Sequence, residues 1–139
     1  MTLAIRPMIH IQNKKYIQGT FSNSATKDSF LHASILFSPR PEFLLYEYGD
    51  LKVSGYGTEY YTIRIKLEDG TTTKLKGELS KGNDRIIIYD KEMINTFLEI
   101  MKKPQVIKIY LEEQSYSVSS YLFSVNTEGF AEIYQEVFE

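Results

Sequence analysis

The feature that most constrains the fold is the run of residues 60–90, which contains three strand patterns in succession and ends where a helix begins. In its first part, apolar and polar residues alternate, a period of two that is typical of a strand with one buried and one solvated face. The apolar set of this strand is Tyr61, Ile63, Ile65 and Leu67. A second strand repeats the alternation with Thr71, Thr73, Leu75, Gly77 and Leu79. The run therefore predicts an antiparallel hairpin, and it contains no catalytic motif.

The turn between these two strands determines their register. A two-residue Asp-Gly loop would set Leu67 opposite Thr72, so that the apolar residues of one strand would face the polar residues of the other. A three-residue loop ending at Gly70 instead pairs Leu67 with Thr71 and keeps both apolar sets on one face of the sheet. The sequence thus predicts a three-residue loop with a positive φ at Gly70.

The end of the run predicts a central strand and a helix. Residues 85–89 include three consecutive isoleucines, which indicates a strand buried on both faces. Asp90 is a good N-cap residue, and Pro104 ends the helical pattern that follows it. Apolar residues recur in this helix at three- and four-residue spacing, which gives it one stripe for packing on the sheet. The stripe consists of Met93, Ile94, Phe97, Leu98 and Met101.

Further strand patterns flank this run. Residues 8–20 predict a strand or a short hairpin, and strands are also expected at 30–37, 42–48, 51–54, 106–111 and 116–125. A closing helix, capped by Asn126 or Thr127, is predicted from the spacing of Phe130, Ile133, Tyr134 and Val137. We therefore predict a single α+β domain over residues 1–139: an antiparallel β-sheet or sandwich of about eight strands with two helices packed on it.

Composition excludes several classes of function. The formal net charge is −2 with both signs interspersed, so the sequence predicts no nucleic-acid partner. The chain has no Cys, which removes disulfides, thiol catalysis and cysteine metal sites. No apolar run approaches the roughly 20 residues that a membrane-spanning helix needs, and no transmembrane segment is predicted. The sequence leaves the oligomeric state open.

The compartment also stays open. The first ten residues lack the apolar core of a signal peptide, which indicates a cytoplasmic protein. A chain cut after its signal peptide would instead belong to the periplasm or the cell envelope.

Candidates for catalysis are few. The chain has only two histidines, His10 and His32, and a histidine base needs a carboxylate that orients it. Ser34 shares a strand face with His32, but no carboxylate is suggested nearby, so we interpret both histidines as structural. Glu47 stands between two tyrosines, yet on a strand its side chain points away from both. The sequence thus predicts no catalytic residue, no metal site and no cofactor, and we expect that the chain is not an enzyme.

Tyrosines form the one concentration with a functional interpretation. Tyrosine combines a large flat apolar surface with a hydroxyl group, and it is enriched in protein interfaces. If Tyr61 points inward, Tyr60 points outward, while Tyr46 and Tyr48 share a face of their own strand. We therefore expect Tyr46, Tyr48 and Tyr60 to be the candidate binding residues. In the alternative interpretation, these side chains cover the edges of the core with their hydroxyls in water.

The order of elements supports a resemblance. Residues 33–137 contain a buried strand, a strand with aromatic ends, a strand closing on an Asp-Gly turn, a polar strand, the three isoleucines, a helix, and a hairpin that leads through Gly129 into the last helix. This order resembles the VasI-type lipoproteins associated with type VI secretion and similar small β-rich envelope domains. Because the chain has no Cys, the lipobox and paired cysteines of such lipoproteins have no counterpart here.

Two function classes follow. The first is a non-catalytic binding or assembly module of a bacterial envelope or secretion-related system, which holds a protein partner. The second is a small-molecule carrier or enzyme with a pocket between the sheet and the helices. An exposed aromatic patch would favour the first class, and a deep pocket with converging polar groups would favour the second.

Overall fold

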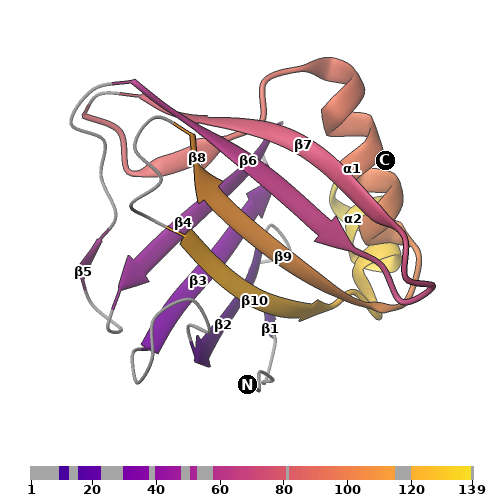
Figure 1. Cartoon of the computed structure of the whole chain (residues 1–139). Helices are drawn as coiled ribbons and strands as arrows, with labels where there is room; N and C mark the ends of the chain where they lie inside the picture. The colour runs from indigo at the N-terminus through magenta and orange to yellow at the C-terminus, as the bar shows by residue number, and fades with distance from the viewer. Residues whose placement is uncertain are drawn as a thin grey trace.

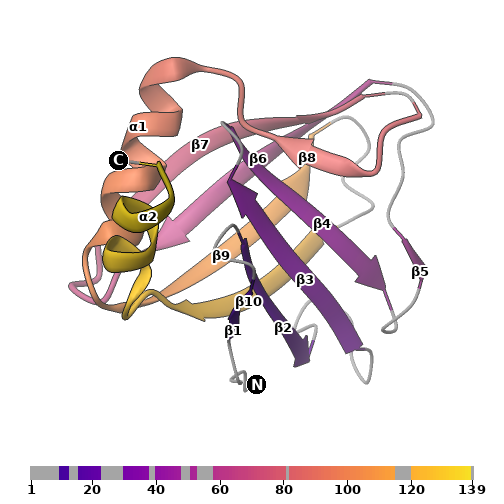
Figure 2. The same cartoon turned by 180° about the vertical axis from the view of Figure 1, so that it is seen from behind.

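A computed structural model describes residues 10–12, 16–22, 30–37, 40–47, 51–52, 58–80, 82–114 and 120–138. These residues form one curved antiparallel sheet with two helices gathered at one of its ends (Figures 1 and 2). The strands are β1 His10–Gln12, β2 Tyr16–Ser22, β3 Phe30–Phe37, β4 Pro41–Glu47, β5 Leu51–Lys52, β6 Glu59–Lys66, β7 Thr72–Leu79, β8 Arg85–Ile87, β9 Val106–Glu113 and β10 Ser120–Asn126. The helices are α1 Lys91–Lys102 and α2 Phe130–Phe138.

The sheet is continuous. Its strand order is β1-β2-β3-β4-β8-β7-β6-β9-β10, with β5 paired to β4, and every pair is antiparallel. The sheet curls about its inner face so that β10 approaches β2 (Figure 1). The predicted α+β class and antiparallel pairing are confirmed. The finer prediction of about eight strands in a sheet or sandwich is corrected, because ten described strands, the short β1, β5 and β8 included, form one curled sheet.

The β6–β7 hairpin has the predicted register. Ile63 lies opposite Leu75, and the loop between the strands is closed by a hydrogen bond of 2.9 Å from Leu67 N to Thr71 O. Gly70 has a φ of 93°, in the left-handed region where glycine is favoured. The three-residue loop with positive φ at Gly70 is therefore confirmed.

The inner face of the sheet forms the core. Side chains with no exposed surface come from β6, from β7, from β9 and from the residue after β8; they are Ile63, Ile65, Leu79, Ile88, Ile107, Ile109 and Leu111. Ile87 is also buried, at 6% exposure, although it faces the opposite side of β8. All three isoleucines are therefore buried, although they point to both sides of the sheet, as predicted. The predicted central position is also confirmed, because β8 lies between β4 and β7.

Helix α1 packs on this core as its pattern predicts. Asp90 caps it, because its Oδ1 accepts a hydrogen bond of 3.1 Å from Met93 N. Phe97 is fully buried, with its ring centroid 6.0 Å from that of Phe37 and 5.7 Å from that of Phe43. The predicted stripe omitted Ile100, which is buried as well.

Helix α2 begins later than predicted. Its first residue is Phe130, after Gly129 with a φ of 87°, so neither Asn126 nor Thr127 is its cap. The Thr127 hydroxyl is used elsewhere: it donates to Lys103 O at 2.6 Å and accepts from Gln105 N at 2.9 Å. These bonds connect the end of α1 to the start of α2.

We predict that Phe97→Ala lowers the free energy of unfolding by about 3–5 kcal/mol, because a buried aromatic ring is replaced by a cavity. Chemical denaturation measures this, with Thr96→Ala at the neighbouring exposed position as the control. A cost near that of the control would show that this helix face is not packed on the sheet.

We also predict that Gly70→Val destabilises the chain by about 1–2 kcal/mol, because a β-branched residue is strained in the left-handed region. No other heavy atom lies within 4 Å of the added Cβ position, so the loss comes from the backbone conformation and not from a clash. Gly70→Asn is the matched variant, since Asn tolerates this conformation better. Equal losses for Val and Asn in thermal denaturation would contradict the prediction.

Candidate functional site

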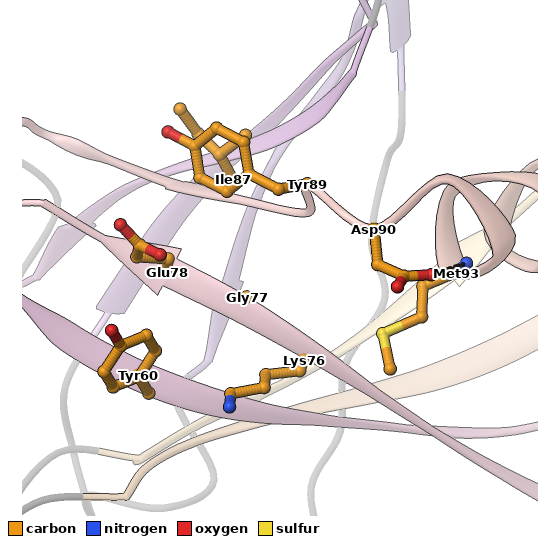
Figure 3. Close-up of a pocket in the computed structure, with 8 residues that line it drawn as sticks. All are labelled: Tyr60, Lys76, Gly77, Glu78, Ile87, Tyr89, Asp90 and Met93. Carbon is orange, nitrogen blue, oxygen red and sulfur yellow. Dashed lines mark hydrogen bonds between the residues drawn. The ribbon is translucent and has the colours of Figure 1, made fainter.

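A hollow lies on the outer face of the sheet, on the side opposite the core (Figure 3). Its volume is about 250 Å³. It is lined by Tyr60 of β6, by Lys76, Gly77 and Glu78 of β7, by Ile87 of β8, and by Tyr89, Asp90 and Met93 at the start of α1. Consecutive elements of the sheet therefore build this site together with the first turn of α1.

Strand register places the lining residues side by side. Tyr60 lies opposite Glu78, and Glu78 lies opposite Ile87, so one row crosses β6, β7 and β8. Because side chains alternate along β6, the burial of Tyr61 on the inner face directs Tyr60 to the outer face. Ile87 forms the apolar floor, and it is shielded from water although it lies outside the main core.

Two exposed tyrosines flank this floor. Tyr60 is 41% exposed and Tyr89 is 44% exposed, and among the described large hydrophobic side chains only Val106 is exposed to a similar extent. A cation packs over each ring: Lys76 Nζ lies 4.8 Å from the Tyr60 centroid and Arg40 Cζ lies 4.7 Å from the Tyr89 centroid. Such contacts are worth about 0.5–1 kcal/mol at exposed sites. The hollow thus presents aromatic surface to solvent.

The polar lining groups already have partners. Glu78 Oε2 accepts a hydrogen bond of 3.2 Å from Ser80 Oγ, and Asp90 Oδ1 caps α1. Lys76 contacts the Tyr60 ring. The lining includes no His, Ser or Thr that could act as a nucleophile or a base beside these groups.

One of the predicted binding residues lies in this hollow. Tyr60 is exposed there, as the alternation of its strand indicates. The backbone of Tyr46 is in β4, opposite His32 and Lys52, but its side chain lies outside the described residues. Tyr48 lies entirely outside them. The grouping of Tyr46 and Tyr48 with Tyr60 stays a prediction.

The sequence analysis missed Tyr89 and Ile87 as site residues. It assigned both to a buried strand, and β8 in fact ends at Ile87, which leaves Tyr89 at the surface before the helix cap. The position of Tyr89 in the sequence was an indication, because this residue directly precedes the N-cap residue. The strand has ended at that point, so it does not bury the side chain. The row that joins Ile87 to Tyr60 depends on the β7–β8 pairing, which local patterns do not show.

Aromatic rings fill the contact between the helices and the sheet. Phe130 of α2 has its centroid 4.9 Å from that of Phe37 and 5.5 Å from that of Tyr134. Together with Phe97, these rings occupy the space where the carrier or enzyme hypothesis expects a ligand. That hypothesis stays a prediction, and this part of the contact gives it no support.

The described part of the chain has neither a metal-ligand cluster nor a membrane-spanning helix. Its residues contain no group of three or more His, Asp or Glu side chains that could hold a metal ion. Neither described helix is long and apolar enough to cross a membrane. The two histidines have backbones in β1 and β3, and their side chains lie outside the described residues.

One buried carboxyl group lies on the inner face. Glu113, at the end of β9 and opposite Tyr61, is only 4% exposed. Burial raises its pKa above the ordinary 4.5, and the neighbouring charge of Glu59 raises it further. Glu113 is therefore a group whose ionisation opposes folding.

Comparison with known proteins gave no relative. No protein family, characterised protein or solved structure matches this chain.

We predict that Glu113→Gln makes the chain more stable than the unmodified protein at neutral pH. Because the folded-state pKa is raised, the neutral Glu113 contributes stability below about pH 4.5, and this contribution is lost as the pH rises through the folded-state pKa. The difference between Gln and Glu at this position should thus grow with pH. Denaturation at a series of pH values measures it.

The matched control for this experiment is Glu99→Gln, at an exposed position of α1. It should leave the pH dependence of stability unchanged. If the stability of Glu113→Gln and that of the unmodified chain changed in parallel with rising pH, the conclusion that the Glu113 charge opposes folding would be wrong.

Proposed function

We propose that this chain is a non-catalytic binding module that holds a protein partner on the outer face of its sheet, with the hollow between Tyr60 and Tyr89 as the anchoring point. The observation that carries the proposal is the pair of exposed rings beside a shielded isoleucine floor. Tyrosine is prominent among the residues that dominate binding energy in protein interfaces. Tyr60, Ile87 and Tyr89 line the same hollow, so a partner side chain placed in it would lie beside both rings.

The size of the hollow supports a side-chain anchor. Its volume of about 250 Å³ lies below the range of about 300–1,000 Å³ that is usual for small-molecule pockets. Charged groups at its edge, Lys76, Glu78 and Asp90, match the polar rim that surrounds the apolar centre of an interface. A single apolar or aromatic side chain of a partner fits this arrangement.

The cellular setting is part of the same proposal. A bacterial envelope or secretion-related assembly is suggested by the resemblance of the element order to VasI-type domains. This setting is supported only by that order, whereas the binding role is supported by the hollow.

We predict that Tyr60→Ala and Tyr89→Ala remain folded and lose partner binding. Both rings are more than two-fifths exposed, so their removal should cost far less stability than the removal of a buried ring. Chemical cross-linking in an extract of the native host, followed by affinity capture, measures partner retention. Gln135→Ala is the control, because Gln135 is exposed on α2 and lies outside the hollow.

Two results would contradict this prediction. Strong destabilisation by both substitutions would show that the tyrosines cover the core edge and are not interface residues. Unchanged capture by folded Tyr60→Ala and Tyr89→Ala chains would show that the hollow is not the anchoring point.

A further inference from the structure

Cations gather on the outer face of three neighbouring strands. Along β6, β7 and β9, the positions that point away from the core carry the basic face, defined as Arg64, Lys66, Lys74, Lys76 and Lys108. The four lysines of this face are exposed. The chain as a whole has 18 acidic and 16 basic residues, so this concentration is not a consequence of composition. The three strands lie side by side (Figure 1).

Two pairs of cations stand directly opposite each other. Arg64 lies opposite Lys74 in the β6–β7 pair, and Lys66 lies opposite Lys108 in the β6–β9 pair. Like charges at directly opposite positions destabilise a sheet. The like-charge pairs on this face therefore lower the stability of the fold. A residue such as Thr, which is present at Thr72, would avoid this repulsion.

Internal carboxylates neutralise only part of this face. Glu112 Oε1 accepts from Arg64 Nη1 at 2.9 Å, so the Arg64 charge is paired. None of the described carboxylates forms an ion pair with Lys66, Lys74 or Lys108. These three lysines are available to a negatively charged partner.

We infer that the basic face binds an acidic segment of the protein partner and continues the anchoring hollow. This inference rests on the proposed function, because Lys76 belongs to both surfaces. Alternate residues of a strand are about 6.6–6.8 Å apart, and an extended segment with alternating carboxylates has the same spacing. An extended acidic segment can therefore meet the lysines of β6 and β7 in register, with an apolar side chain in the hollow.

The face favours an acidic protein segment over single-stranded nucleic acid. Nucleic acid binding of this kind needs aromatic faces on which bases stack. The Tyr60 ring carries Lys76 Nζ over its face, and Tyr110, opposite Arg64, is partly buried.

The test uses three labelled probes with the full chain: a peptide of alternating Glu and Thr, a peptide of alternating Gln and Thr, and an oligothymidylate. Fluorescence anisotropy should show binding of the acidic peptide alone, weakening with added salt. Lys74→Thr and Lys108→Thr should each weaken this binding by about two- to fivefold. Lys91→Thr, at an exposed position of α1, should leave it unchanged.

Stability provides a second readout on the same variants. Since Lys74→Thr and Lys108→Thr each remove one member of a like-charge pair, they should keep or raise the denaturation midpoint while they lose binding. A merely structural role for these lysines would lower the midpoint. Weak binding cannot then be attributed to unfolding.

Several results would overturn the inference. The acidic peptide could fail to bind, or Lys91→Thr could weaken it as much as the variants of the face. Tighter binding of oligothymidylate, lost with the same variants, would assign the face to nucleic acid instead. If capture of the host partner depended on Tyr60 and Tyr89 while the acidic peptide did not bind, only the inference about the basic face would be wrong. If capture depended on Lys74 and Lys108 alone, the hollow would not be the anchoring point, and the basic face would remain the binding surface.

Discussion

The pairing of β6 with its two neighbours is the constraint on which the rest of the structure depends. β6 forms ladders with both β7 and β9, and the loop at Gly70 sets the first of these registers. With this register, Ile63 and Ile65 face the core with no exposed surface. A shift by one residue would exchange the two faces along the whole strand. The same register that buries the isoleucines therefore exposes the cations and Tyr60.

Buried polar contacts tie the helices to this sheet. Between α1 and β9, Gln105 donates through Nε2 to Ile100 O at 3.2 Å, and its backbone accepts from Thr127 N at 2.9 Å. Polar groups buried in this way are costly unless they are hydrogen-bonded. The contacts orient α1 so that Phe97 meets Phe37 and Phe43 across the inner face. In the described part of the chain, the core thus forms on one face of the sheet, and the outer face of β6, β7 and β9 carries the exposed lysines.

Local chemistry explains which parts of the fold were predictable. The Gly70 loop, the Asp90 cap and the buried isoleucines follow from turn geometry, capping and periodicity, all of which act within a few residues. The single curled sheet was not predictable, because β4 pairs with β8 across a long stretch of chain. The site depended on the same long-range pairing. Tyr60 could be placed on the outer face from β6 alone, whereas its neighbour Ile87 required the β7–β8 register. Lys108 likewise joins the basic face only through the pairing of β6 with β9. Local sequence patterns do not show this pairing, and the net charge of −2 does not indicate a basic surface.

We propose that the inner face of the sheet stabilises the fold and that the outer face of β6, β7 and β9 binds the partner. The most direct test is a titration of the isotope-labelled chain with the peptide of alternating Glu and Thr, followed through its amide chemical shifts. We expect the largest shift changes on residues 60–66, 72–78 and 106–112, extending to Tyr89, while the exposed side of α2 is unaffected. Changes concentrated in α1 and α2, or no change at saturating peptide, would contradict it.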